Sequence, residues 1–470
     1  MTGEDDEFQE VVAAVRERID PDERERARMR EVAAELTERA EAAVADLPVD
    51  ADAMQVGSTA RGTWISGDRD IDLFVRFPAD LDREDLESYG LQVGHAVLPD
   101  GREEFAEHPY VTGEYEGFDV DLVPCYRLES ATDIRSAVDR TPFHNEYLAA
   151  RLDDDLAGDV RLFKQFLKGI GAYGSDLRTR GFSGYLTELL VLEYGGFREV
   201  VAAAADEWHP PVRFDPEDHG AVEFDDPLVV VDPTDPERNV AAVCAAENVA
   251  RLQHYARDLL EAPREELFFP EPTEPLSAAA VRERVEARGT TPVAVRFDAP
   301  DVVEDQLYPQ LRKSLAGVRD GLDRRGFDVL RAATFADETA VLVAELAVAE
   351  RPAVERHEGP PVHVRQHAEG FYGKYAGERG SSRPATQSRD AENPEVYGPF
   401  VDGDRYVVER PREFETAGAF LRSDALLDVA LGVRVESALE DGYDVLVGDE
   451  IADLADEFGT ELADYFDPRP

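Results

Sequence analysis

The chain has 470 residues, 43% of them hydrophobic, so it is long enough for about three domains and apolar enough to fold. Its 102 Asp and Glu residues outnumber its 50 Lys and Arg residues, which gives a formal net charge of −52. Two cysteines cannot form a disulfide framework, no apolar run approaches the ~20 residues of a membrane-spanning helix, and the acidic N-terminus lacks a signal-peptide pattern. This composition excludes fibrous, disulfide-rich secreted and integral-membrane proteins, and we expect a cytoplasmic one.

The acidic residues are spread along the whole chain, and lysine occurs at only four positions, 164, 168, 313 and 374. A diffuse carboxylate coat with few lysines is typical of a protein that works in concentrated salt, since at 1 M salt a Debye length of about 3 Å screens self-repulsion. We therefore expect the cytoplasm of a halophile. The net charge does not decide whether the partner is a nucleic acid, because a locally basic groove can lie within an acidic surface.

The first third of the chain changes from a helical period to a strand period near residue 52. Apolar residues recur at helical spacing before that point and alternate with polar ones in two later runs, which are separated by Gly, Pro and Asp. We expect helices over 8–19, from Pro21 onward with Asp20 as the cap, and over 84–98, and strands over 71–77 and 118–123. This order predicts a small α+β unit.

The remainder has a helical pattern from 143 to 265 and a mixed pattern beyond a Pro-rich linker at 268–275. We expect helices over 159–168, 184–194 (with Ser183 as its cap and Gly195-Gly196 at its end), 239–261, 278–287, 311–325 and 411–422, strands over 292–297, 340–348 and 405–409, and a mobile loop at 377–396. The predicted fold class is multidomain α+β, with domains at 1–145, 146–267 and 276–470.

The most informative motif is Gly57-Ser58-Thr59-Ala60-Arg61, followed by a strand that carries Asp70 and Asp72. The first part is a turn into a short helix, whose backbone N–H groups, hydroxyl and guanidinium suit an anion such as phosphate. Because side chains alternate along a strand, both aspartates leave the same face, and such carboxylates repel each other unless a cation such as Mg²⁺ lies between them.

A second acidic strand follows, in which Asp119 and Asp121 alternate with apolar residues. If it lies beside the first, a third carboxylate reaches the same place, and three carboxylates that hold two metal ions form the arrangement of in-line phosphoryl transfer. The alternative is a strand with a solvated acidic face, which is common in so acidic a chain. The full combination of turn, paired aspartates and second strand favours the phosphoryl-transfer interpretation.

Taken together, these motifs resemble the polymerase-β-like nucleotidyltransferase superfamily, and within it the archaeal, class I CCA-adding enzymes. The resemblance covers roughly residues 50 to 320 and is looser beyond them. The matching strings are Gly-Ser-Thr-Ala-Arg-Gly-Thr-Trp (57–64), Asp-Val-Asp-Leu-Val-Pro-Cys-Tyr (119–126), Asp-Arg-Thr-Pro-Phe-His (139–144), Val-Arg-Leu-Phe-Lys (160–164), Arg-Gly-Phe-Ser-Gly-Tyr-Leu (180–186), Asp-Pro-Glu-Arg-Asn-Val-Ala (235–241) and Val-Glu-Asp-Gln-Leu-Tyr-Pro-Gln (303–310).

The resemblance implies template-independent addition of C, C and A to the 3′ end of tRNA, from CTP and ATP, with release of pyrophosphate. It implies a catalytic palm, a helical neck and a C-terminal α+β region that binds the acceptor and TΨC arms of tRNA, in a homodimer. Carried over residue by residue, it implies two Mg²⁺ ions on Asp70, Asp72 and Asp121, triphosphate contacts from Ser58 and Arg61, contacts to CTP or ATP from His144, Lys164 and Tyr173, and Arg238 near the base.

Each of these accessory residues also has a structural interpretation. Lys164 and Lys168 are four apart on what could be a solvated helix face, His144 could be a structural hydrogen bonder, Tyr173 could be a packed loop aromatic, and Arg238 could form a surface salt bridge. The two cysteines and the scattered histidines lack the spacing of a zinc site. Two other functions stay open, an RNA-tailing enzyme such as a poly(A) polymerase with the same carboxylates, and a non-catalytic RNA-binding relative.

Overall fold

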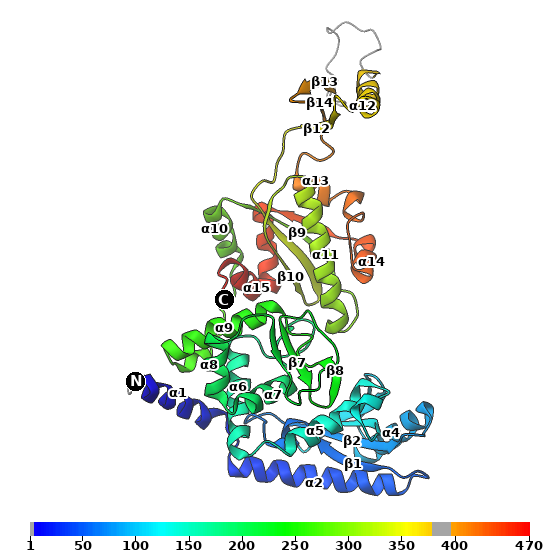
Figure 1. The fold of residues 1–470 in the computed structure, drawn as a ribbon, viewed down its shortest axis with the longest axis vertical. Coiled ribbons are helices and arrows are strands. Elements are labelled where there is room, and N and C mark those ends of the chain that lie inside the picture. The colour runs from blue at the N-terminus through cyan, green and yellow to red at the C-terminus, as the bar shows by residue number, and fades with distance from the viewer. Residues whose placement is uncertain (1–3, 378–395) are drawn as a thin grey trace. The chain divides into compact units, whose positions relative to one another are not determined.

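The computed structural model describes residues 4–377 and 396–470, and the chain divides into two compact units between residues 271 and 272 (Figure 1). Both units combine helices with β-sheets, so the predicted α+β multidomain class is confirmed. The predicted loop at 377–396 lies outside the described residues, apart from its two ends. The finer division into three domains stays a prediction. None of the helices in the described part of the chain is both long enough and apolar enough to cross a membrane.

The first unit opens with two helices and a five-stranded sheet. The sheet has the order β1-β2-β5-β4-β3, in which β2 and β5 are parallel neighbours and the other pairs are antiparallel. The elements are α1 Glu4–Ile19, α2 Glu23–Ala45, β1 Asp52–Val56, α3 Gly57–Arg61, β2 Asp70–Pro78, α4 Arg83–Val97, β3 Arg102–Phe105, β4 Pro109–Tyr115 and β5 Phe118–Arg127.

Alternation along β2 decides which face of this sheet is apolar. Ile71, Leu73 and Val75 are buried in one cluster with residues of α2 and α4, and Val120 and Leu122 of β5 join them. The residues between them, including the aspartates, therefore belong to the opposite face. The predicted strands and the helix between them are confirmed, with ends shifted by a few residues.

The cap of α2 differs from the prediction. The helix begins at Glu23, and its cap is Asp22, whose carboxylate accepts a hydrogen bond from the Glu25 backbone N–H at 2.7 Å while the Glu25 carboxylate accepts one from the Asp22 N–H. This reciprocal pair satisfies two exposed N–H groups. The Asp20-Pro21 pair therefore lies in the connection before the helix.

The rest of the first unit is more mixed than its helical pattern indicated. Its elements are η1 Ala131–Asp133, η2 Ala137–Arg140, α5 Thr141–Ala149, α6 Asp154–Gly169, α7 Gly184–Tyr194, α8 Phe197–Asp206, β6 Val212–Phe214, β7 Leu228–Asp232, β8 Asp235–Asn239, α9 Ala246–Glu261 and η3 Glu265–Leu267. Ser183 caps α7 and Gly195 ends it in a left-handed conformation, as predicted.

The sheet β6-β7-β8 was not predicted, and the helix expected from residue 239 begins only at Ala246. β7 is buried along its whole length, so its apolar residues do not alternate, and a short continuous apolar run has no distinct strand period.

The second unit contains two antiparallel sheets, of four strands in the order β10-β11-β9-β15 and of three in the order β12-β14-β13. Its elements are α10 Ala278–Arg288, β9 Thr291–Asp298, α11 Glu304–Arg324, β10 Val329–Ala336, β11 Thr339–Leu346, β12 Val354–Pro361, α12 Arg365–Gly377, β13 Tyr397–Asp402, β14 Arg405–Pro411, α13 Ala417–Leu421, η4 Asp424–Leu426, α14 Val433–Asp441, β15 Asp444–Val447, η5 Gly448–Leu454 and α15 Ala455–Phe466. The larger sheet buries apolar side chains on both faces, against α11, α13 and α14 on one and against α10 and α15 on the other.

The helix predicted over 411–422 is wrong in its first half. Pro411 is the last residue of β14, and α13 begins only at Ala417 after Thr416, whose hydroxyl accepts a hydrogen bond from the Ala419 N–H at 3.1 Å. The capping residue therefore defines the start of the helix better than the apolar period does.

Candidate active site

The three predicted aspartates lie on the two parallel strands at the centre of the N-terminal sheet. In the register of β2 and β5, Asp72 is opposite Asp121 and Asp70 is opposite Asp119. Since successive side chains alternate, all of these carboxylates are on the face that does not pack against α2 and α4. The predicted adjacency of the two acidic strands is therefore present.

The electrostatics of these carboxylates show how crowded the charge is. Burial and the neighbouring charges of Asp121 and Asp70 raise the pKa of Asp72 to about 6, although the Arg61 guanidinium opposes the shift. Burial, followed by the charges of Asp68 and Asp119, also raises the pKa of Asp70. The negative charge of these neighbouring carboxylates is not balanced by the nearby Arg and Lys side chains. Carboxylate oxygens that are this close and this negative suit a divalent cation such as Mg²⁺.

The side chains do not converge on one point. Within residues 4–377 and 396–470, no three or more His, Cys, Asp or Glu side chains are close enough together to hold a metal ion as a group. The fit of these aspartates to a metal therefore rests on their strand register and their chemistry.

Gly57 allows the turn between β1 and α3 to pack closely on Asp72. Its φ of +79° belongs to the left-handed region, and a Cβ atom there would come within 2.2 Å of Asp72 Oδ2. A side chain at this position would have to displace the carboxylate. The Gly57 backbone therefore packs directly against Asp72, and Ser58 is the next residue along the chain.

Four of the predicted nucleotide-binding residues line one cavity of about 190 Å³. They come from two helices and one loop: Ser58 and Arg61 from α3, Lys164 from α6, and Tyr173 from the loop after α6. Tyr185 and Glu188 of α7 also line the cavity. The charge of Arg61 lowers the pKa of Asp72, and the charge of Lys164 lowers the pKa of Asp70, against the larger opposing effects of burial and neighbouring acids. The cavity therefore lies next to the aspartates.

Arg61 is held by a buried carboxylate that the sequence analysis did not identify. Glu188 accepts two hydrogen bonds from the guanidinium, at 3.0 and 2.8 Å, and a third at 2.6 Å from the Thr63 hydroxyl, while Asn145 accepts one from Arg61 at 2.8 Å. Three of the five guanidinium donors are engaged in these bonds. Arg61 is therefore fixed in place before any nucleotide binds.

Lys164 has a similar arrangement on the other side of the cavity. Its ammonium group lies 2.7 Å from one carboxylate oxygen of Asp68, and the ammonium group of Lys168 lies 3.7 Å from the other. Burial alone would lower the pKa of Lys164, but the charges of Tyr173 and Asp68 raise it, so the group stays protonated. The Lys164 ammonium also lies 5.6 Å from the centroid of the Tyr173 ring.

His144 and Arg238 do not line this cavity but meet at another buried carboxylate. Asp232 Oδ2 lies 2.8 Å from His144 Nε2 and 2.7 Å from Arg238 Nη1. The His144 ring stacks on Tyr185, with ring centroids 3.8 Å apart. Through Tyr185 this pair is connected to the wall of the cavity.

Sequence reasoning therefore missed the carboxylates that hold the predicted cations, namely Asp68, Glu188 and Asp232. One signal was available for Glu188, because it stands among the apolar residues Leu186, Leu189 and Leu190 of the predicted helix 184–194. A charged residue on such a face needs a partner. The partners themselves are 84 or more residues away in the sequence for Arg61 and His144, and no local pattern identifies them.

The sheet and its aspartates define the class of protein. Residues 37–144, which include β1 to β5 and the three aspartates, match the family model described as a nucleotidyltransferase domain. Residues 158–269 match the tRNA nucleotidyltransferase second domain, and residues 288–448 match the C-terminal domain of the CCA-adding enzyme. The chain is thus a nucleotidyltransferase.

Curated relatives match along the whole chain. The CCA-adding enzyme of Haloarcula marismortui is 63% identical and covers 99% of this chain and 100% of its own length. That of Halorubrum lacusprofundi is 62% identical, with coverage of 99% and 100%. The chain belongs to the CCA-adding enzyme family. The predicted family is therefore confirmed, and the expected halophilic origin agrees with the source of both relatives.

A solved structure of E. coli MS115-1 CdnC with ATP is 20% identical and covers 55% of this chain and 94% of that one, with a TM-score of 0.42.

Proposed function

We propose that this protein adds C, C and A in sequence to the 3′ end of tRNA, without a nucleic-acid template, using CTP and ATP and releasing pyrophosphate. The observation that carries the proposal is the parallel register of β2 and β5, which pairs Asp72 with Asp121, with Asp70 two residues before Asp72 on the same strand, in a member of the CCA-adding enzyme family. The RNA-tailing alternative would use the same carboxylates. The 62–63% identity to CCA-adding enzymes over 99% of the chain favours CCA addition.

Asp70, Asp72 and Asp121 are the proposed ligands of two Mg²⁺ ions. When bound, these ions supply positive charge to the triphosphate and to the attacking 3′-hydroxyl. Asp121 is on the strand next to Asp72 and is assigned to the attacking side, where its carboxylate helps to accept the proton of that hydroxyl. Asp70 and Asp72, from one strand, are assigned to both ions.

The cavity beside the aspartates is the proposed triphosphate site. Ser58 offers a hydroxyl, Arg61 has two guanidinium donors beyond those held by Glu188 and Asn145, and Lys164 has two ammonium protons beyond the one donated to Asp68. These cations are oriented before the substrate arrives, so they need little rearrangement when it binds. Such preorganised charge and positioning supply much of the catalysis in phosphoryl-transfer sites. Tyr173 provides an aromatic wall for the nucleotide.

His144 and Arg238 are proposed to contact the nucleoside end of CTP or ATP. Arg238 lines a second cavity of about 710 Å³, together with Arg140 and Asn239. A guanidinium presents several donors in one plane, which suits the edge of a base. The proposed route of the nucleotide therefore leads from the aspartates, past Tyr185, to Arg238.

The test is incorporation into tRNA that lacks CCA, in molar KCl, with labelled CTP and ATP supplied singly and together. We expect two C and one A to be added, followed by a stop, whereas an untemplated A tail would show an RNA-tailing enzyme instead. Asp121→Asn should lose at least a hundredfold of the rate and still bind tRNA. The matched control is Asp119→Asn, on the same strand and face, which should keep most of the rate.

We further propose that the C-terminal region binds the acceptor and TΨC arms and that the enzyme acts as a homodimer in the cytoplasm. A region that reads A-form shape and phosphates needs no base sequence, which suits an enzyme that acts on all tRNAs. Nuclease footprinting of bound tRNA should protect those two arms, and light scattering in molar KCl should give twice the chain mass.

A further inference from the structure

Asp232, the last residue of β7, is a buried carboxylate that accepts hydrogen bonds from four side chains and one backbone group. Oδ2 lies 2.8 Å from His144 Nε2 and accepts a hydrogen bond from Arg238 Nη1 at 2.7 Å. Oδ1 accepts hydrogen bonds from the Thr234 N–H at 2.9 Å, the Thr234 hydroxyl at 2.8 Å and the Tyr185 hydroxyl at 3.4 Å. The side chain is fully buried.

Two of these partners, the Arg238 guanidinium and the Thr234 N–H, can only donate, which favours an ionised carboxylate. Burial would raise the pKa of Asp232, but the hydrogen bonds from His144 and Thr234 hold it well below its usual range. Because an ionised carboxylate only accepts hydrogen bonds, His144 must carry its proton on Nε2. Asp232 thus fixes the tautomer of His144 as well as its orientation.

The carboxylate also lies between the two parts of the proposed nucleotide site. Tyr185, which bonds to Oδ1 and stacks on His144, lines the cavity with Ser58, Arg61 and Lys164. Arg238, which bonds to Oδ2, lines the second cavity. One buried group therefore connects the triphosphate end to the base end.

We infer that Asp232 is a positioning residue that holds His144 and orients Arg238, and that through Arg238 it sets the discrimination between CTP and ATP. The inference rests on the proposed function, because only there do Arg238 and His144 contact the nucleotide. Cytosine and adenine carry their hydrogen-bond acceptors and donors at different positions on the base edge. A protein donor therefore distinguishes the two bases only if its direction is fixed. An Arg238 without Asp232 keeps its charge but loses that direction.

The test is Asp232→Asn, because the amide keeps the shape but replaces one acceptor oxygen with an N–H₂ donor. That donor must face either the His144 and Arg238 pair or the Thr234 and Tyr185 pair, so one side of the network breaks. We expect misincorporation at the C and A steps to rise at least tenfold, through KM for the correct nucleotide, with kcat at saturation changed less than fivefold.

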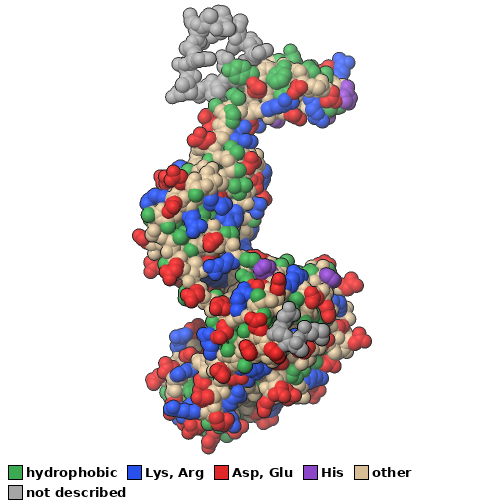
Figure 2. All heavy atoms as spheres, turned by 90° about the vertical axis from the view of Figure 1, so that its left-hand side faces the viewer, with side chains coloured by type: hydrophobic (Ala, Val, Ile, Leu, Met, Phe, Trp, Pro, Cys, Tyr) green, Lys and Arg blue, Asp and Glu red, His purple; other side chains and the backbone are tan. Residues whose placement is uncertain are grey.

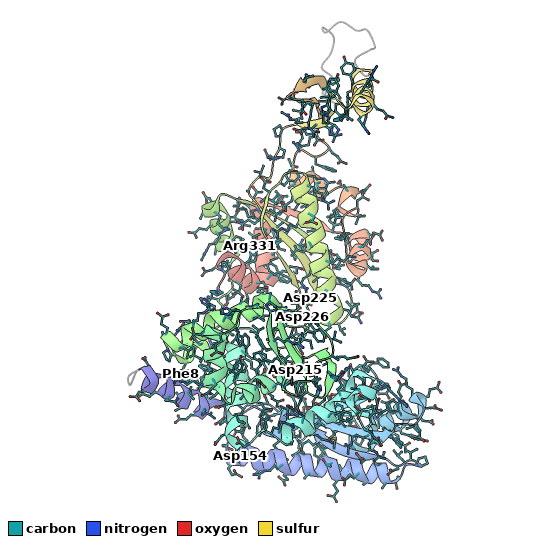
Figure 3. All side chains as sticks on the ribbon, viewed as in Figure 1. Phe8, Asp154, Asp215, Asp225, Asp226 and Arg331 are labelled. Atoms are coloured by element: carbon teal, nitrogen blue, oxygen red, sulfur yellow. The ribbon has the colours of Figure 1, made fainter. Side chains whose placement is uncertain are left out.

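The matched control is Asp226→Asn. Asp226, labelled in Figure 3, lies just before β7 and accepts a hydrogen bond from the Asn239 amide at 2.9 Å, and it is not among the five hydrogen-bonding contacts of the Asp232 carboxylate. Its discrimination should stay within twofold of the wild type. If Asp232→Asn fails to fold, Thr234→Val removes one donor from Oδ1, and altered discrimination is expected there too.

A double variant separates positioning from general damage. Because Asp232 acts through Arg238, Asp232→Asn should change discrimination by less than twofold in an Arg238→Ala background. Two outcomes would overturn the inference while leaving CCA addition intact. One is wild-type discrimination in Asp232→Asn, or in Thr234→Val if only that variant folds. The other is fully additive effects in the double variant. A wild-type protein that adds neither C nor A to tRNA would instead overturn the proposed function.

Discussion

Asp72 lies beside two like charges on a partly buried strand, so its ionisation works against folding. Its pKa is about 6 in the folded protein, above the ordinary value of 3.8. Below pH 3.8 both states bind the proton, and as the pH rises through the window up to about 6 the unfolded state releases it first, so stability falls. Above that window the cost is about 3 kcal/mol.

Asp72→Asn should remove this cost. We expect the variant to be more stable than the wild type by about 2–3 kcal/mol at pH 7 without divalent ions, to differ little at pH 4, and to lose incorporation. Urea unfolding at both pH values measures the difference, with Asp119→Asn as the control. A stability gain that does not depend on pH would show that charge repulsion is not its cause.

A common arrangement at the residue scale is a cation held by a buried or half-buried acid. Arg61 is paired with Glu188, Lys164 with Asp68, and Arg238 with Asp232. The acid fixes the direction of the cation and reduces its net charge, so each cation is oriented for an anion without repelling its neighbours. Arg238 does form a salt bridge, but with the fully buried Asp232 and not with a surface acid, and this pairing is compatible with the nucleotide contact that we propose.

At the scale of elements, the junction of β1, α3 and β2 decides where the aspartates and the Gly-Ser turn meet. Gly57 begins α3 and Gly62 follows its last residue, and both have positive φ, +79° and +72°. A Cβ at Gly57 would strike Asp72 Oδ2, whereas one at Gly62 would meet nothing within 4 Å. The two glycines thus form a matched pair with equal backbone demand and different surroundings.

Gly57→Ala and Gly62→Ala should cost similar stability, about 1 kcal/mol each, because both place a side chain in the left-handed region. Only Gly57→Ala should also lose at least a hundredfold in kcat/KM, since it displaces the Asp72 carboxylate. Incorporation kinetics together with thermal unfolding separate the two effects. Equal activity in both variants would mean that the contact with Asp72 is not needed.

At the scale of the whole molecule, the acidic surface is the main determinant of the conditions under which the protein folds. Figure 2 shows Asp and Glu side chains over the visible surface of both units, with Lys and Arg interspersed among them. With a formal net charge of −52, self-repulsion opposes the compact state unless salt screens it.

We therefore expect stability to rise steeply with KCl. The melting temperature should increase by more than about 10 °C between 0.2 and 2 M, with most of the increase at the low end, where the Debye length changes most. Circular dichroism during heating measures it, and tRNA lacking CCA should be extended only where the chain is folded. A melting temperature independent of KCl would show that surface repulsion does not limit folding.

Some features could be derived from the sequence because they depend on short-range geometry. Asp70, Ile71 and Asp72 alternate with the strand period, so the sequence determined that both carboxylates share a face opposite the apolar core. Ser183 and Gly195 determined the ends of α7 by capping chemistry. The family strings determined the class of enzyme.

The tertiary structure alone decided the pairings that connect distant residues. Asp121 faces Asp72 because β5 joins β2 in parallel register, and Glu188 meets Arg61 across 127 residues of sequence. The sheet β6-β7-β8, which carries Asp232, could not be derived because a fully buried strand shows no alternation. A periodic pattern reports which face of an element is apolar, but a buried ion pair forms only where the packed chain brings two opposite charges together and excludes water.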